Sequence, residues 1–205
     1  MKPIHGALLL HLLLAPGVQV AHAQGGSLSL DIRQDTLPNG LKVITIEQHR
    51  APVVSVQVWV HTGSKDEVPG ITGISHLFEH LMFKGSRKYG PEEHARVVQS
   101  NGGQLNAFTT QDVTAYYEDF PSDRMELAFM LEAERFQNLK MTEETLKTER
   151  EVVKEERRLR TDNTPTGVAV EQFFAAAYTA HPYGWPVVGW MSDLDAITLK
   201  QCQEY

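Results

Sequence analysis

The sequence predicts an α+β fold in which a mixed or antiparallel sheet packs against several helices. The chain has 205 residues, 41% of them hydrophobic, so it can build the core of one ordinary domain. Segments rich in β-branched residues lie mainly in the first 120 residues, and amphipathic helical patterns dominate the remainder. Strands followed by several helices, without strict alternation, are typical of the α+β class.

The first 23 residues are expected to be a signal peptide that does not belong to the fold. Lys2 supplies a positive start, residues 7–15 form a short apolar stretch, and Ala21-His22-Ala23 fits an A-x-A cleavage site. A membrane anchor or a disordered tail is the alternative, but the stretch is too short to span a bilayer. We therefore expect an exported protein without a stable membrane span after cleavage, periplasmic rather than secreted. Because Cys202 is the only cysteine, no internal disulfide is expected.

The strands come first along the chain. Residues 24–35 are expected to be a polar lead-in, and the domain proper to occupy residues 36–205. Asn39-Gly40 is a strong signal for a tight turn. Strands are predicted over residues 42–47, 52–61, 104–109 and 113–120. We expect the first two of them to form a hairpin or to lie side by side.

The helices follow from apolar periodicity and from the glycines and prolines that bound them. Helices are predicted over residues 71–83, 91–101, 121–136, 142–160 and 168–178, with a last helix that starts at Ser192 or Asp193. The first of these has apolar residues around most of its surface, so we expect it to be largely buried.

That buried helix carries the segment His76-Leu77-Phe78-Glu79-His80. Residues four apart on a helix share a face, which places the two imidazoles about 6 Å apart along the axis. Two neutral imidazoles can hold a zinc ion, and a carboxylate beside them can take a proton from water. The order is that of the inverted H-x-x-E-H motif. The same five residues also occur by chance, and a single histidine on an apolar helix face is usually a core residue.

A catalytic zinc ion usually has three protein ligands, so a third must come from another segment. On the predicted helix 142–160, Glu149, Val153 and Glu156 share one stripe with Leu146. A carboxylate on an apolar stripe is costly unless it is paired or bound to metal. The other charged residues there resemble a solvated face with i,i+3 and i,i+4 pairs, namely Glu151, Lys154, Glu155, Arg157, Arg158 and Arg160. Spacing alone does not decide which glutamate faces inward.

Four blocks of the sequence resemble the pitrilysin (insulinase-like) family of inverted-motif zinc metallopeptidases. Its metal-helix block resembles residues 63–67 and 73–85, its substrate-strand block 102–109 and 114–117, its distal-glutamate block 149–156, and a later signature 181–190. The resemblance extends over roughly residues 36–205, in order and with family-like spacing. It implies the fold of the family's N-terminal catalytic domain.

The resemblance also implies a set of site residues. One zinc ion per chain would be bound by His76, His80 and Glu156, with Glu155 as the competitor for the third position. Glu79 would be the general base, and Glu149 an accessory glutamate that assists the site. Asn106 and Ala107 would lie on the strand that binds an extended peptide by strand addition. Without the resemblance, Asn106 would be read as a turn or strand-end residue.

The function implied is that of an exported zinc endopeptidase that acts on peptides or small unfolded polypeptides. The net charge of −7 gives no basic footprint for nucleic acid. In the family, the arginine and tyrosine that stabilise the transition state belong to a later domain, and no residue of this chain corresponds to them. A second peptidase-like domain or subunit is therefore a candidate partner.

Two alternatives remain at this point. The chain can be a non-catalytic peptidase-like subunit, or a truncated fragment that binds zinc but needs a second domain for activity. A structural zinc module is disfavoured, because such sites normally have four protein ligands and often use cysteines.

Overall fold

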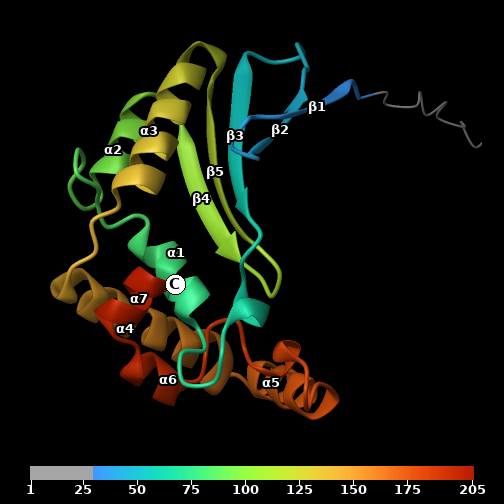
Figure 1. The fold of residues 1–205 in the computed structure, drawn as a ribbon, viewed down its shortest axis with the longest axis vertical. Helices are drawn as coiled ribbons and strands as arrows, with labels where there is room; N and C mark the ends of the chain where they lie inside the picture. The colour runs from blue at the N-terminus through green and yellow to red at the C-terminus, as the bar shows by residue number, and fades with distance from the viewer. Residues whose placement is uncertain (1–29) are drawn as a thin grey trace, which may run out of the picture. The chain divides into compact units, whose positions relative to one another are not determined.

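The computed structural model describes residues 30–205 and confirms the α+β class (Figure 1). The predicted signal peptide lies outside the described residues. The chain divides into two compact units, residues 1–49 and 50–205. None of the described helices is both long and apolar enough to cross a bilayer.

The described part of the first unit is an antiparallel hairpin of β1 (Ile32–Thr36) and β2 (Lys42–Ile46). The predicted turn joins them: Gly40 has φ 88° and its amide donates to the Leu37 carbonyl at 2.8 Å. One expectation needs correction: β2 pairs with β1 instead of with the strand that follows. The pairing strand, residues 32–36, overlaps the end of the expected polar lead-in of residues 24–35. The reason is that the Asn-Gly turn folds the preceding residues back along β2, although they are mostly polar.

The second unit contains a three-stranded antiparallel sheet in the order β3-β5-β4. Its strands are β3 (Val53–Val60), β4 (Gln104–Thr109) and β5 (Thr114–Pro121), each within one residue of its predicted bounds. The register of the sheet pairs Thr114, at the start of β5, with Val60 of β3 on one side and with Thr109 of β4 on the other. Of the described strands, only β5 pairs with β4, whose other edge is unpaired.

Helices α2 (Glu93–Ser100) and α3 (Met125–Asn138) lie on one face of this sheet (Figure 1). The alternation of the strands places every second side chain beneath these helices. The core between sheet and helices is formed by Val56, Val98, Phe120, Ala128 and Leu131.

A second core surrounds α1 (Ile74–Leu81), which packs on α4 (Glu143–Arg157). The short helices α6 (Met191–Ala196) and α7 (Leu199–Glu204) complete it. The buried residues are Ile74, Leu77, Leu81, Leu146, Val153, Leu194, Ile197 and Cys202. Where one last helix was predicted, two form, because Thr198 caps a new helix by accepting from the Gln201 amide.

Several helix ends differ from the prediction. Helix α1 begins at Ile74 instead of residue 71, because Gly70 and Gly73 adopt positive φ angles of 98° and 88° before it. Helix α4 continues into a π-helical turn, Arg158–Asp162. Helix α5 (Pro165–Ala177) starts three residues early, because Thr164 caps it and Pro165 occupies its first position.

Candidate metal centre

The helix that carries the histidines is fixed at its first turn by two carboxylates from other segments. Glu67 accepts hydrogen bonds from the Gly73 amide (2.8 Å), the Ser75 amide (2.9 Å) and the Ser75 hydroxyl (2.6 Å). Asp193 accepts from the amide and hydroxyl of Thr72, at 3.2 and 2.7 Å. These contacts satisfy amides that the start of a helix leaves free. The Asp193 carboxylate, whose pKa is lowered by its hydrogen bonds although burial opposes the shift, also places negative charge where the helix dipole favours it.

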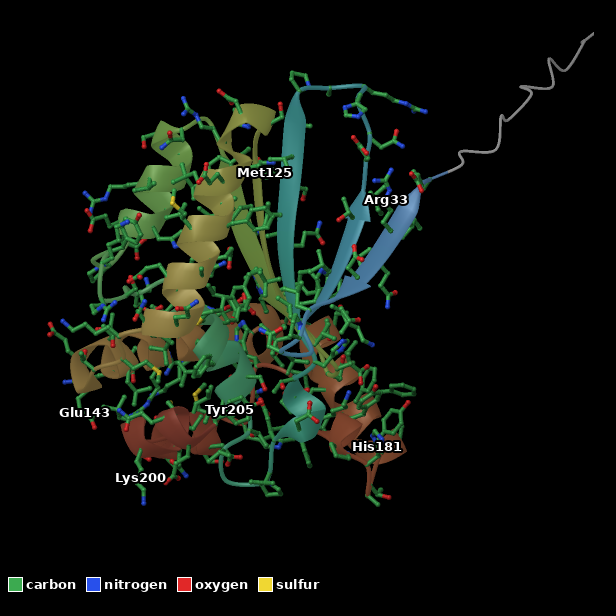
Figure 2. The ribbon with its side chains drawn as sticks, turned by 45° about the horizontal axis from the view of Figure 1, so that its top comes forward. Arg33, Met125, Glu143, His181, Lys200 and Tyr205 are labelled. Atoms are coloured by element: carbon green, nitrogen blue, oxygen red, sulfur yellow. The ribbon has the colours of Figure 1, made fainter. Side chains whose placement is uncertain are left out.

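A close backbone approach holds the same turn from the other side. Gly73 and Gly189 both have positive φ angles, 88° and 83°. A Cβ atom on Gly73 would lie 2.5 Å from the Val188 carbonyl oxygen, and one on Gly189 would lie 2.2 Å from the Thr72 oxygen. Two sequence blocks more than 100 residues apart therefore meet at the start of α1. Tyr205 also reaches α1 (Figure 2), where its hydroxyl lies 2.7 Å from Ser75 Oγ.

Three candidate ligand atoms converge beside α1. Glu156 Oε2 lies 3.6 Å from His76 Nε2 and 3.4 Å from His80 Nε2, and all three atoms lie within 4.8 Å of one another. Ligand distances of about 2.0–2.2 Å around tetrahedral zinc give ligand–ligand edges of about 3.4 Å. The atoms are therefore spaced as ligands around a common centre instead of as hydrogen-bonded partners. Burial, with the nearby His80, lowers the pKa of His76 to about 4, so its imidazole is neutral at pH 7, as a metal ligand must be.

Glu156, and not Glu155, turns toward the histidines. The Glu155 side chain is 57% exposed and pairs with Arg158 at 2.9 Å. The second carboxylate oxygen of Glu156 pairs with Arg160, which leaves Oε2 directed at the imidazoles. Of the two glutamates that the sequence left in competition, only Glu156 is placed to be a ligand.

Glu79 lies next to the cluster and contacts the end of β4. The hydroxyl of Thr109 donates to Glu79 Oε2, and Thr109 Oγ1 itself lies 3.4 Å from Thr114 Oγ1. Burial raises the pKa of Glu79, against the opposing effects of the Thr109 hydrogen bond and of His80. A carboxylate with a raised pKa is a better proton acceptor, which suits a general base.

Glu149 contacts the other nitrogen of His80. Its side chain is only 4% exposed, with Oε2 3.5 Å from His80 Nδ1 and Oε1 3.3 Å from Lys84 Nζ. This is the position of a carboxylate that orients a ligand and is not itself a ligand. The two glutamates on this stripe of α4 thus have different positions: Glu156 lies among the candidate ligand atoms, and Glu149 lies beside the other nitrogen of His80.

A cleft of about 1050 Å³ opens above these residues. Helix α1 and the end of α4 line one side, and β4 from Asn106 to Thr109 lines another. Asn106 accepts a hydrogen bond from the Ala107 amide at 2.9 Å through its own side chain. Both residues predicted to bind substrate therefore border the cleft that contains the candidate ligands.

Comparison with known proteins identifies the family. A family model described as Insulinase (Peptidase family M16) matches residues 42–189. The chain belongs to this family. The match includes the inverted motif, the β4 strand and the Glu149–Glu156 stripe, and it confirms the resemblance drawn from the sequence.

Two curated proteins resemble the chain over most of its length. The zinc protease PqqE of Helicobacter pylori is 37% identical over 171 residues, which are 83% of this chain and 38% of that protein. An uncharacterized zinc protease of Mycobacterium leprae is 36% identical over 177 residues, 86% of this chain and 40% of that protein. The chain therefore spans about two fifths of the length of these relatives.

A solved structure shows the same fold. The crystal structure of a protease from Helicobacter pylori superimposes with a TM-score of 0.83 at 37% identity, over 85% of this chain and 42% of that one.

One residue of this insulinase-family chain lies where the sequence did not predict it. Arg157 was expected on the solvated face of α4, but it is buried. It binds Glu171 of α5 through two hydrogen bonds, at 2.7 and 3.1 Å, and donates to the Gly189 carbonyl at 2.9 Å. The reason is that Glu171 of α5 and the backbone at Gly189 lie against Arg157, which a helical pattern read on α4 alone does not reveal.

A second cluster, which the sequence reasoning missed, lies between the sheet and its helices. His94, Glu118 and Glu132 are buried within 4.8 Å of one another. Here the groups contact each other directly: His94 Nε2 bonds to Glu118, and Arg135 binds both oxygens of Glu132. Because Arg135 already supplies the cation, we interpret the cluster as a buried ionic network instead of a metal centre. The sequence feature that indicates this network is the i,i+3 pair Glu132–Arg135, which lies beside the apolar positions of α3.

Proposed function

We propose that this chain is an exported zinc-dependent endopeptidase, or the N-terminal catalytic part of one. The observation that carries the proposal is the convergence of His76, His80 and Glu156 at metal-ligand spacing, with Glu79 beside them in the same cleft. The donor set fits zinc: two imidazole nitrogens and a carboxylate oxygen leave the fourth position free, as in catalytic sites.

When bound, zinc would act as a Lewis acid that makes water more acidic and polarises the scissile carbonyl. The residues of the chain supply the remaining chemistry. Glu79 Oε1 or Oε2 takes the proton of the attacking water and delivers it to the leaving amine. The Thr109 hydroxyl holds that carboxylate at the end of β4, so the proton acceptor is fixed relative to the strand beside it.

The substrate we propose is a peptide or a small unfolded polypeptide bound as an added strand. The edge of β4 away from β5 is unpaired in the described structure and borders the cleft. Backbone groups of an extended peptide can pair with such an edge at Asn106 and Ala107 irrespective of side chains. An extended segment at this edge would pass close to Glu79, because Thr109 belongs to the same strand.

Export is proposed from the leader pattern of residues 1–23. We also propose a second peptidase-like domain or subunit as partner, because the chain covers about two fifths of its relatives. The alternative is a non-catalytic subunit, or a fragment that binds zinc but cleaves peptides only with such a partner.

The test is zinc content together with cleavage of an unstructured peptide, for the wild type, Glu79→Gln and Glu156→Gln. We expect one zinc per chain in the wild type, retained zinc without cleavage in Glu79→Gln, and lost zinc in Glu156→Gln. Glu155→Gln is the matched control on the neighbouring position and should behave as the wild type. Cleavage that survives Glu79→Gln would exclude Glu79 as the base, and zinc without cleavage in the wild type would support the non-catalytic alternative.

A further inference from the structure

A chain of two contacts leads from His80 in the candidate metal centre through Glu149 to Lys84. We propose that Lys84 is a positioning residue for the metal: it fixes the carboxylate of Glu149, which in turn orients His80. The inference rests on the proposed function, because it assumes that His80 is a zinc ligand. Lys84 has no ion pair with the proposed ligand Glu156 or with the proposed base Glu79, so its proposed effect on the site passes through Glu149.

The geometry supports an ordered relay. Glu149 uses its two oxygens for two different partners: Oε2 faces His80 Nδ1 at 3.5 Å, and Oε1 faces Lys84 Nζ at 3.3 Å. Lys84 is anchored in turn by Glu92 at 2.7 Å. Lys84 lies three residues beyond the end of α1, and its side chain and that of His80 reach one carboxylate on α4.

Burial explains why Glu149 needs this cation. Its side chain is 4% exposed, and it lies on a stripe between Leu146 and Val153, which are both fully buried. A buried carboxylate is costly unless charged or hydrogen-bonding groups compensate it. Lys84, at 24% exposure, is the cation within ion-pair distance among the described residues. Without it, one oxygen of Glu149 would lack a partner, and the carboxylate would be free to rotate away from His80.

The orientation of His80 determines which of its nitrogens can bind a metal. A carboxylate at Nδ1 keeps the ring proton on that nitrogen and leaves the Nε2 lone pair available. Nε2 is the atom that faces Glu156 at 3.4 Å. Lys84 would therefore act on the metal site only through Glu149, by holding the ring in the tautomer and rotation that present Nε2.

Charge repulsion alone predicts the opposite effect of Lys84 on zinc binding, so the direction of the change decides the test. A lysine near a metal site repels the cation, so removing its charge would by electrostatics alone tighten zinc binding. If Lys84 is a positioning residue, its removal weakens zinc binding instead. The two explanations thus predict changes in opposite directions.

The experiment measures the zinc dissociation constant of the full chain by competition with a chromophoric chelator, at fixed pH and salt. The variants are Lys84→Met, Glu149→Gln and the double variant, with Lys147→Met as control. Lys147 is an exposed lysine on α4, two residues from Glu149. Loss of an outer partner of a metal ligand typically weakens binding about 10–100-fold, and we expect about tenfold for Lys84→Met. The double variant should bind no more weakly than Glu149→Gln alone, and Lys147→Met should bind as the wild type.

Each other outcome contradicts a specific statement. Unchanged or tighter zinc binding in Lys84→Met overturns the positioning role, and so do losses that add in the double variant. A wild type that binds no zinc overturns the proposed function itself and is thereby distinguished from a failure of this inference. The thermal midpoint of each metal-free variant shows whether it is folded. If Lys84→Met does not fold, Lys84→Gln replaces it at the same half-buried position, with the same expected direction.

Discussion

At the scale of single residues, one step along a helix separates a candidate ligand from a surface residue. Adjacent residues on an α-helix point about 100° apart. Glu156 therefore falls on the stripe of Glu149 and Val153, and Glu155 turns to solvent and pairs with Arg158. The sequence identified the stripe and both candidates, but the direction of the stripe depends on how α4 packs against α1. That packing is a tertiary contact, and the residue spacing within α4 alone does not predict it.

Thr109 is a residue whose role the sequence did not suggest, because threonine is an ordinary strand residue. Its hydroxyl donates to Glu79. Thr109→Val keeps the shape of the side chain but removes the donor, so the carboxylate should be less well oriented. We expect kcat for peptide cleavage to fall about 10- to 150-fold, the equivalent of the roughly 1.5–3 kcal/mol that a hydrogen bond to a charged group contributes.

KM and zinc content should change little in Thr109→Val, and Thr109→Ser should recover most of the activity, because it retains the hydroxyl. Steady-state kinetics of the three proteins, in the chain or in the assembly that cleaves peptides, checks this. A loss that Thr109→Ser does not recover would show that the methyl group, and not the hydrogen bond, is what matters.

At the scale of elements, the start of α1 depends on a buried glutamate from the preceding loop. Burial raises the pKa of Glu67 to about 7, although the hydrogen bonds from Ser75 and Gly73 oppose the shift. The unfolded value is near 4.5, so the folded state binds the proton more tightly. The contribution of Glu67 to stability is therefore fully present below pH 4.5 and is lost as the pH rises to about 7.

A shift of that size corresponds to about 3 kcal/mol. We expect the free energy of unfolding of the wild type to fall relative to Glu67→Gln between pH 4.5 and 7, and the difference to be constant above that range. Urea unfolding of both proteins across this range provides the measurement. Parallel pH profiles would show that Glu67 does not titrate in this window, whatever the absolute stability of the variant.

The elements themselves were largely predictable, and their partners were not. Strands β3, β4 and β5 follow from local composition, whereas the order β3-β5-β4 joins segments more than 50 residues apart. Strand β1 was missed because its residues are mostly polar and its pairing comes from the turn. The shortened start of α1 was missed because Gly73 meets Gly189, a contact that exists only in the folded chain.

At the scale of the whole molecule, the sheet and its two helices are joined by a buried ionic network. Arg135 is 2% exposed, binds Glu132, and stacks on the rings of Phe83 and Tyr116 at 4.9 and 4.7 Å. Phe83 also lines the cleft, so this network supports one wall of the candidate site.

Glu132→Gln would leave Arg135 without its nearest counter-charge inside the core. Breaking a buried pair in this way costs about 3–5 kcal/mol. Chemical unfolding should therefore show a large loss of stability, and Glu126→Gln, on the exposed side of the same helix, should show almost none. Similar stabilities for the two variants would mean that Glu118 or water replaces the lost partner.

The candidate metal centre joins α1 and α4 of the second core, so metal binding and folding should be linked. His76 and His80 come from α1 and Glu156 from α4, and an unfolded chain would not hold them together. A ligand that binds only the folded state, at a free concentration 1,000 times its dissociation constant, stabilises it by about 4 kcal/mol. For a chain of this size, that corresponds to a rise in the thermal midpoint of about 8–16 °C. We expect a chelator to lower the midpoint by this amount and added zinc to restore it, in thermal unfolding followed by circular dichroism.

Two variants serve as controls for the zinc effect. Glu156→Gln should unfold at one temperature with or without zinc, whereas Glu155→Gln should keep the full dependence on zinc. A zinc effect that persists in Glu156→Gln would place the bound ion elsewhere in the protein.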